Sequence, residues 1–264
     1  MAKKLIINAD DYGRTAAIST GIRESHLKGL VSTSTVMMNF STAIDDIGLA
    51  HTECPKLGLG VHLTLTAGRP VLPAAQVPSL VNNDGTFFKL NQLTSAYSQV
   101  NPAELRAEWQ AQIEKFLATG TALDHLDSHH HSSYFTETAF GLMLDLANEY
   151  GTSVRRPRPM NEMVGNTEFV ERLLAEKRTR CPDHFVTTFY DVGATLANLL
   201  DIFNALPMGL TEVMSHPGYL DEEILRDSAY NRQRETELAI LTSPEARSAL
   251  ESGHIQLTTF TAAL

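Results

Sequence analysis

Two adjacent carboxylates follow the first apolar run of the chain. The run KKLIINA leads directly into Asp10 and Asp11, within the sequence NADDYG. Neighbouring carboxylates repel each other unless a cation or a proton lies between them. A solvated turn with a helix cap is the simpler alternative, because Asp is common at both. The pair therefore points to chemistry only if other ligand-type side chains lie near it in the fold.

A dense group of imidazoles and carboxylates lies further along the chain. The stretch DHLDSHHH, residues 124–131, holds four His and two Asp. In an extended strand, His125, Asp127 and His129 share one face, with Ser128 and His130 on the other. Imidazole combined with carboxylate suits zinc, iron, nickel or manganese better than calcium. Asp127 has a second interpretation, as an acceptor that fixes a histidine tautomer. The alternative is a solvated polar loop.

Two more histidines lie near the ends of predicted strands. In LGLGVHLTL, His62 alternates with leucines and valine, so it faces the side opposite the apolar residues. His216 follows the run EVMS and precedes Pro217 and Gly218. Each histidine alone fits a buried core position. In a β/α barrel, however, the carboxyl ends of the strands meet at one rim, where the chemistry is placed. We therefore expect the four strand ends to form one site.

Short strands alternate with helices along most of the chain. About seven or eight such units predict an α/β fold with a mostly parallel sheet, and a distorted (β/α) barrel is favoured over an open sheet. No linker divides residues 1–264, so a single domain is expected, with 66–95 as an irregular insertion or loop. The predicted strands are 4–9, 30–39, 57–65, 122–129, 153–157, 184–190, 210–218 and 255–260, the last of which could close the sheet. The predicted helices are 17–29, 43–53, 102–120, 137–151, 195–206 and 234–253.

Composition excludes several classes of protein. The net charge is −10, from 21 basic and 31 acidic residues, with no basic stripe, which disfavours a nucleic-acid partner. No stretch is long and apolar enough for a membrane span, and the first apolar run is too short for a signal peptide. Two widely spaced cysteines, Cys54 and Cys181, form neither a disulfide framework nor a thiolate metal site. We expect a cytoplasmic protein with no membrane partner.

Six motifs resemble those of one known family. They are LIINADDYG, VSTSTVMMN, LGVHLTLTAGRPV, DHLDSHHH, SHPGY and LTSPEARSAL, and they run from residue 5 to about residue 250. In this order they resemble the YdjC-like carbohydrate deacetylases, which include chitooligosaccharide deacetylases and are related to polysaccharide deacetylases with a distorted (β/α) barrel. The resemblance implies a metal-dependent hydrolase of chitin degradation. Its substrate would be a small acetylated amino sugar or chitooligosaccharide, with or without a phosphate.

The resemblance also implies roles for particular residues. Asp11, His62 and His129 would hold one divalent ion, Mg²⁺ or Zn²⁺. Two imidazoles with one carboxylate chemically favour zinc over magnesium. Asp10 would be the catalytic base and His216 the general acid. Because neighbouring strand residues face opposite ways, we expect the chain to turn at Asp10–Asp11.

The substrate contacts are less defined by the motifs. The predicted ones are His131, Tyr12 and Arg156, and Phe87 with Phe88 would form a covering loop, whereas Trp109 is expected in the core. An arginine of VRRPRP would orient the base, with Arg155, Arg156 and Arg158 as candidates. Many members of the family continue DSHHHVH, whereas this chain continues with Ser132 and Ser133, which bears on sugar preference more than on the reaction.

Three further expectations concern function and assembly. A homo-oligomer, a dimer, is expected from apolar loops within 66–95. A metal-dependent phosphoesterase on a similar barrel is one alternative activity, and it would normally need ligands for more than one ion. A sugar-binding protein without catalysis is the other, and the intact set of carboxylates and imidazoles disfavours it.

Overall fold

The sheet is a half-barrel of seven parallel strands, ordered β5-β4-β3-β2-β1-β7-β6. The structure is a computed structural model and describes residues 2–157 and 168–264. The strands are β1 (Lys3–Tyr12), β2 (Thr33–Val36), β3 (Gly58–Leu63), β4 (His125–Ser128), β5 (Ser153–Val154), β6 (His184–Val186) and β7 (Gly209–Ser215). All the paired strands are parallel, which confirms the predicted α/β fold and distorted barrel.

The last predicted strand does not close the barrel. β8 (Gln256–Leu257) pairs with the first residues of β1, where Lys4 lies opposite Gln256 and Leu5 opposite Leu257. Across 2–157 and 168–264, no strand ladder joins β5 to β6. The expectation that 255–260 closes the sheet is therefore wrong, because this short strand adds to the start of the central strand.

Helices follow most strands, as the alternating pattern predicted. Thr15 caps α1 by accepting from the Ile18 amide, and Pro102 begins α4 after the Asn101 cap. The predicted helix 234–253 is two helices, because Ser243 caps a new helix that begins at Pro244. The helices are α1 (Ala16–Leu27), α2 (Ala43–Glu53), α3 (Leu90–Ala96), α4 (Pro102–Leu117), α5 (Glu137–Glu149), α6 (Glu168–Lys177), α7 (Leu196–Ala205), α8 (Glu222–Asp227), α9 (Gln233–Leu241), α10 (Pro244–Ser252) and α11 (Phe260–Ala263).

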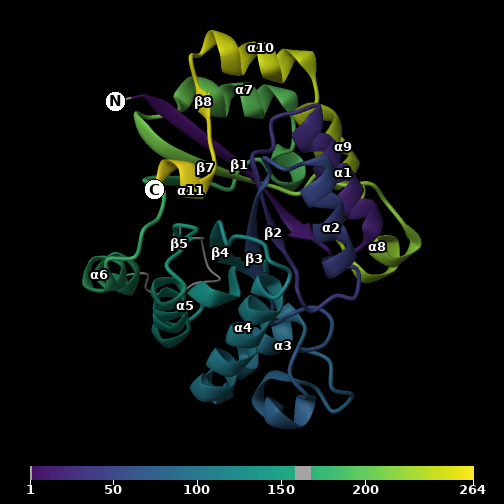
Figure 1. Ribbon diagram of the computed structural model, residues 1–264, viewed down its shortest axis with the longest axis vertical. Helices are drawn as coiled ribbons and strands as arrows, with labels where there is room; N and C mark the ends of the chain where they lie inside the picture. The colour runs from purple at the N-terminus through teal and green to yellow at the C-terminus, as the bar shows by residue number, and fades with distance from the viewer. Residues whose placement is uncertain (1, 158–167) are drawn as a thin grey trace.

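The helices surround the sheet and bury its outer face. In Figure 1, α1, α2 and α9 lie on one side of the strands, and α4 and α5 lie toward the opposite end of the sheet. Val61 and Leu63 of β3 are fully buried in the main core, together with Trp109 and Phe116 of α4. Trp109 is thus a core residue, as the sequence predicted. The apolar face of β3 packs outward, which leaves His62 for the barrel interior.

The stretch 66–95 is mostly irregular, as predicted. It contains two 3₁₀ helices, η1 (Ala74–Gln76) and η2 (Pro78–Leu80), and an isolated bridge between Val81 and Phe87. It ends inside α3, a helix that the sequence pattern did not indicate. Within the described ranges, no helix has both the length and the apolarity that crossing a membrane requires.

Candidate active site

The chain turns at the adjacent carboxylates, as the sequence analysis expected. Asp11 has φ 72, and the β1–β2 register shifts between Ala9 and Tyr12. A positive φ is uncommon for a residue other than glycine and is costly unless its surroundings hold it in place. The turn brings both Asp10 and Asp11 to the wall of one cavity, where they are only 2% and 1% exposed.

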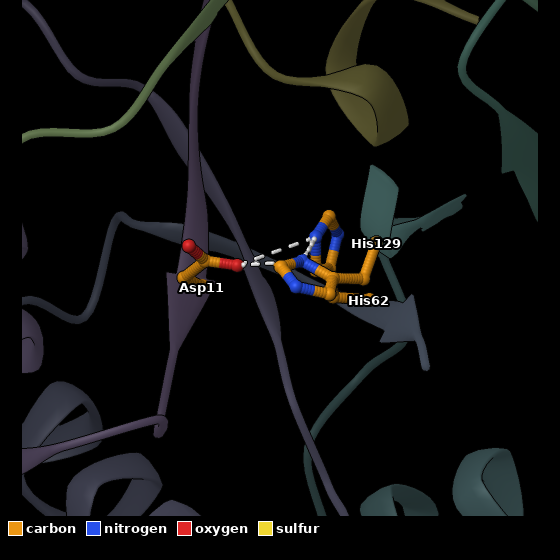
Figure 2. Close-up of side chains that lie close together, drawn as sticks. All are labelled: Asp11, His62 and His129. Atoms are coloured by element: carbon orange, nitrogen blue, oxygen red, sulfur yellow. Dashed lines mark hydrogen bonds and ion pairs between the residues drawn. The ribbon is translucent and has the colours of Figure 1, made fainter. Parts of the chain in front are cut away.

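Asp11, His62 and His129 converge from three parts of the sheet edge. Asp11 Oδ1 lies 3.1 Å from His129 Nδ1 and 3.5 Å from His62 Nε2. The two imidazole nitrogens are 3.3 Å apart. Figure 2 shows one oxygen of Asp11 directed at both rings. Apart from these two contacts, this buried oxygen has no partner among the described residues. The three predicted ligands therefore form one group of donor atoms that could hold a metal ion.

Asp127 fixes the orientation of His62. His62 Nδ1 lies 2.6 Å from Asp127 Oδ1, so the proton belongs on Nδ1 and the lone pair on Nε2. Burial lowers the pKa of His62, but Asp127 outweighs it and raises that pKa. Burial lowers the pKa of His129 to about 4, although the negative charge of Asp11 acts to raise it. His129 is therefore neutral at pH 7 and able to act as a ligand.

Arg155 binds Asp10, the other carboxylate of the adjacent pair. Its Nη1 and Nη2 donate to the two oxygens of Asp10 at 2.8 and 2.7 Å, and Asn8 adds a bond of 2.8 Å. Burial would raise the pKa of Asp10, but the Arg155 guanidinium holds it well below its usual range. Asp10 is thus ionised and oriented. Of the two candidate arginines that the structure describes, Arg155 contacts Asp10, the predicted base, and Arg156 binds Glu171; Arg158 lies outside the described residues.

Arg155 also binds two further buried carboxylates. Its Nε donates to Glu212 at 2.6 Å, and its Nη1 lies 2.8 Å from Asp127. Burial raises the pKa of Glu212 to about 7, although Arg155 opposes that rise. Asp10, His62 and Asp127 form a second group with metal-ligand spacing. Because the Arg155 cation lies on both carboxylates of that group, it already supplies the positive charge that an ion would bring there.

His216 lies beside Asp10 on the other side of the cavity. Its Nε2 is 3.8 Å from Asp10 Oδ2, and its buried Nδ1 has no hydrogen-bond partner among the residues described. Burial lowers the pKa of His216 to about 4, with Asp10 opposing. The rings of Tyr190 and Tyr230 stack at 4.3 Å, and both meet the imidazole edge-on at 5.3 Å. The predicted general acid is therefore held next to the predicted base.

One of the three predicted substrate contacts lies at the cavity, and the other two do not. His131 lines the cavity, and no described residue forms a hydrogen bond with its Nδ1. Tyr12 is fully buried in the core, where its hydroxyl donates to the Asp46 carbonyl. Arg156 turns toward the surface and binds Glu171. Tyr12 and Arg156 are therefore not placed to contact a substrate, because both side chains are engaged outside the cavity.

Two adjoining cavities open from the carboxyl ends of the strands. The inner cavity, about 260 Å³, is lined by Asp10, Asp11, His62, His129, His131 and His216. The outer cavity, about 1020 Å³, is lined by Phe87, Lys89 and other residues of 66–95, and by residues of 223–230. Arg14, His129, His130, Tyr190 and Tyr230 line both, so the two spaces adjoin each other. Phe87 was predicted in a covering loop and does line the outer cavity.

Similarity to known sequences agrees with this geometry. A sequence model described as YdjC-like protein matches residues 4–252, nearly the whole chain. The chain belongs to the YdjC-like protein family. It is 38% identical over 259 residues to a carbohydrate deacetylase of Brevibacillus brevis, covering 97% of this chain and 98% of that one. It is 32% identical over 258 residues to a carbohydrate deacetylase of Thermoanaerobacter pseudethanolicus, covering 98% of both.

Solved structures share the fold of this YdjC-like protein. One is a protein of Enterococcus faecalis V583 whose name refers to cellobiose-phosphate cleavage. It aligns with a TM-score of 0.91 at 33% identity, over 99% of this chain and 98% of that chain. A family 4 carbohydrate esterase from Streptomyces lividans, in complex with acetate, has a TM-score of 0.52 at 11% identity and covers 97% and 91%. At 11% identity, the similarity to the carbohydrate esterase shows a shared fold and nothing about activity. The predicted similarity in fold to polysaccharide deacetylases is confirmed.

Sequence reasoning missed three buried charged residues around the site. Glu212 lies on β7 and binds Arg155. Arg234 binds Asp11 Oδ2 at 2.5 Å, and Glu237 accepts from the His216 amide. Arg234 and Glu237 lie in RQRETE, which has the composition of an exposed helix turn. Alternation along β7 places Glu212 on the inward face, so the sequence pattern could have predicted this residue. Nothing in RQRETE indicates that Arg234 and Glu237 are buried.

Proposed function

We propose that this YdjC-like protein is a metal-dependent hydrolase that removes the N-acetyl group from a small acetylated amino sugar. The observation that carries the proposal is the geometry of the inner cavity. Three potential metal ligands lie on one side of it, and a base and an acid lie beside them. Amide hydrolysis needs these parts: an activated water, stabilisation of the developing oxyanion, and a proton for the departing amine.

Asp11, His62 and His129 are the proposed metal ligands. Tetrahedral zinc with bonds of about 2.0–2.1 Å sets its donor atoms about 3.3 Å apart. The three separations, 3.1, 3.3 and 3.5 Å, lie around that value, and Asp11 Oδ1 has no other partner within 2–157 and 168–264. A divalent ion held there would act as a Lewis acid toward the acyl oxygen and lower the pKa of the attacking water. Zinc suits this donor set better than magnesium, which prefers oxygen ligands.

Asp10 is the proposed general base. Arg155 keeps it ionised and leaves it fixed beside the ligand group, so it can take a proton from water as the water attacks the acyl carbon. Because the Arg155 guanidinium favours the ionised form of this carboxylate, Asp10 readily passes that proton on.

His216 is the proposed general acid. With a lowered pKa it starts neutral, so it must gain a proton before it can give one. Asp10 Oδ2, 3.8 Å from its Nε2, is the adjacent source once Asp10 has taken the proton of the water. The protonated imidazole then delivers this proton to the amine nitrogen as the C–N bond breaks. The products are acetate and the free amino sugar.

The identity of the sugar is the finer part of the proposal. Relatives named carbohydrate deacetylase support an acetylated sugar, and the outer cavity offers room for a second ring. A small chitooligosaccharide fits both observations. The name of the Enterococcus faecalis protein, which refers to a sugar phosphate, makes phosphorylated forms worth testing.

An acetate-release screen tests the proposal. The purified protein is stripped of metal, then assayed with Zn²⁺ or Mg²⁺ on acetylated mono- and disaccharides, with and without a 6-phosphate. Phosphate release from the phosphorylated sugars is measured in the same wells. We expect metal-dependent acetate release with at least one acetylated sugar. Release of phosphate without acetate would replace the proposal with a phosphoesterase, and binding without turnover would leave a sugar-binding protein.

A further inference from the structure

The first turn of α9 carries two buried charged residues that face the site. Arg234 and Glu237 are 2% and 0% exposed, although their neighbours in RQRETE, Arg232 and Glu235, are exposed. Residues three apart lie on one face of a helix, so this single turn presents a cation and a carboxylate side by side. Burying such groups is costly without specific partners, and each of them has partners within the site.

Arg234 holds the outer oxygen of Asp11. Its Nη2 donates to Asp11 Oδ2 at 2.5 Å, and its Nε donates to the Tyr230 carbonyl at 3.0 Å. The planar guanidinium is thus fixed at two points. Arg14 is more distant, at 3.9 Å from the same oxygen. With Oδ2 engaged, the carboxylate leaves Oδ1 turned toward His129 and His62, with no further partner in the part of the chain that the structure describes.

Glu237 holds the backbone that carries His216. Its Oε2 accepts from the His216 amide at 2.5 Å, and its Oε1 accepts from the Tyr230 hydroxyl. The Tyr230 ring in turn contacts the edge of His216. Glu237 therefore restrains His216 twice, once through the main chain and once through the aromatic ring beside it.

We propose that Arg234 and Glu237 are positioning residues. Arg234 sets the rotation of the Asp11 carboxylate for the metal, and Glu237 sets the position of His216 relative to Asp10. One turn of α9 thus aligns both the metal ligand Asp11 and the proposed acid His216. The proposal has two halves. The Glu237 half, its role in positioning His216, rests on the proposed function. The Arg234 half, its role in orienting Asp11, requires only that Asp11, His62 and His129 bind a metal ion.

Two physical effects of Arg234 on the metal oppose each other. Its positive charge repels a cation, while its fixed geometry orients the ligand. Arg234→Lys separates them, because lysine keeps the charge but cannot donate to Asp11 and the Tyr230 carbonyl together through one planar fork. Loss of a partner that orients a metal ligand typically weakens metal binding about 10–100-fold.

Zinc titration of the metal-free protein against a competing chelator tests the Arg234 half. We expect Arg234→Lys to weaken zinc binding about 10-fold, and the exposed control Arg232→Lys to leave it unchanged. Zinc binding by Arg234→Lys equal to that of the parent would overturn this half. Absorption of Co²⁺ in the same proteins reports ligand geometry independently of affinity. A changed Arg234→Lys spectrum is expected, and one identical to the parent contradicts the proposal.

Steady-state kinetics of acetate release test the Glu237 half. Glu237→Gln keeps an acceptor for the His216 amide, so it should stay within about threefold of the parent, whereas Glu237→Met should lower kcat about 100-fold. KM and zinc affinity should not change in either variant, and the exposed control Glu235→Met should match the parent. Equal kcat in Glu237→Met and the parent would overturn this half. If the parent releases no acetate, the proposed function fails, while the zinc titration still decides the Arg234 half.

Discussion

The inner and outer cavities share several wall residues but are built in different ways. In the inner cavity the carboxylates are buried and each is bound by a buried arginine, Asp10 by Arg155 and Asp11 by Arg234. The outer cavity is lined in part by exposed charged residues from two separate segments: Asp84, Lys89, Glu223 and Asp227. Buried charges held by partners and exposed charges in contact with water act differently on a substrate.

The difference separates chemistry from selection of the substrate. Charges held in a region of low dielectric act strongly on a transition state and need no reorganisation during the reaction. Exposed charges are screened by water and bind the ground state and the transition state about equally. Changes in the inner cavity should therefore lower kcat or stability, and changes in the outer cavity should raise KM.

The largest effect is expected from Arg155→Met. This change leaves Asp10, Asp127 and Glu212 buried around a neutral side chain, and breaking a buried ion pair costs about 3–5 kcal/mol. The free energy of unfolding, measured with urea, should fall by that amount, and acetate release should be lost. The exposed control Arg232→Met should unfold like the parent. A loss below about 1 kcal/mol in Arg155→Met would remove the argument that buried charge organises the inner cavity.

The second largest effect is expected from His216→Asn. Removing a general acid typically costs about 10²–10⁴-fold in rate, so kcat should fall within that range while KM and bound metal remain. Steady-state kinetics and metal analysis of the purified variant provide the measurement. If His216→Asn keeps its kcat, another group protonates the amine.

Glu212→Gln tests how the inner cavity tolerates three carboxylates around one arginine. The pKa of Glu212 is raised from 4.5 to about 7, so the folded state holds a proton that the unfolded chain releases. This contribution to stability is complete below pH 4.5 and is lost as the pH rises to about 7, at most about 3 kcal/mol. Glutamine cannot ionise and lacks this dependence.

The measurement is the unfolding free energy of both proteins at several pH values. The stability of the parent relative to Glu212→Gln should decrease between pH 4.5 and pH 7. A difference that is constant, or that grows with pH, would mean that Glu212 is ionised throughout as a partner of Arg155.

The smallest effect is expected in the outer cavity. Lys89 is exposed there, so Lys89→Met should raise KM about two- to tenfold without changing kcat, as loss of uniform binding does. Lys56→Met, another exposed lysine and not among the residues lining either cavity, is the matched control. A large fall in kcat for Lys89→Met would break the separation of roles between the cavities.

Much of the fold followed from local signals, whereas the set of three ligands came from the resemblance to the YdjC-like family. Alternating strands and helices gave the parallel half-barrel, and the period of two in LGLGVHLTL placed His62 inside it. The turn at Asp11 followed from requiring two neighbouring side chains to reach one cavity. Signals of this kind lie within a few residues of each other, so sequence shows them.

The partners that orient the site were harder to predict. Arg234 meets Asp11 across 223 positions, and nothing in RQRETE distinguishes it from Arg232. Tyr12 follows Asp11 directly, yet the turn sends its side chain to Asp46 in the core. Arg155 and Arg156 follow the end of β5 at Val154, and which of them turns inward to Asp10 depends on how this short strand pairs with β4. Tertiary packing decides these cases.

The central claim is that Asp10 and Asp11 divide the work between base and metal ligand, and one pair of variants tests it. Bound zinc and acetate release are measured side by side for Asp10→Asn, Asp11→Ala and the parent, all prepared in the same way. The structure predicts that Asp11→Ala loses the metal, whereas Asp10→Asn keeps it and loses about 10²–10⁴-fold in kcat. Equal loss of metal from both variants would contradict the division.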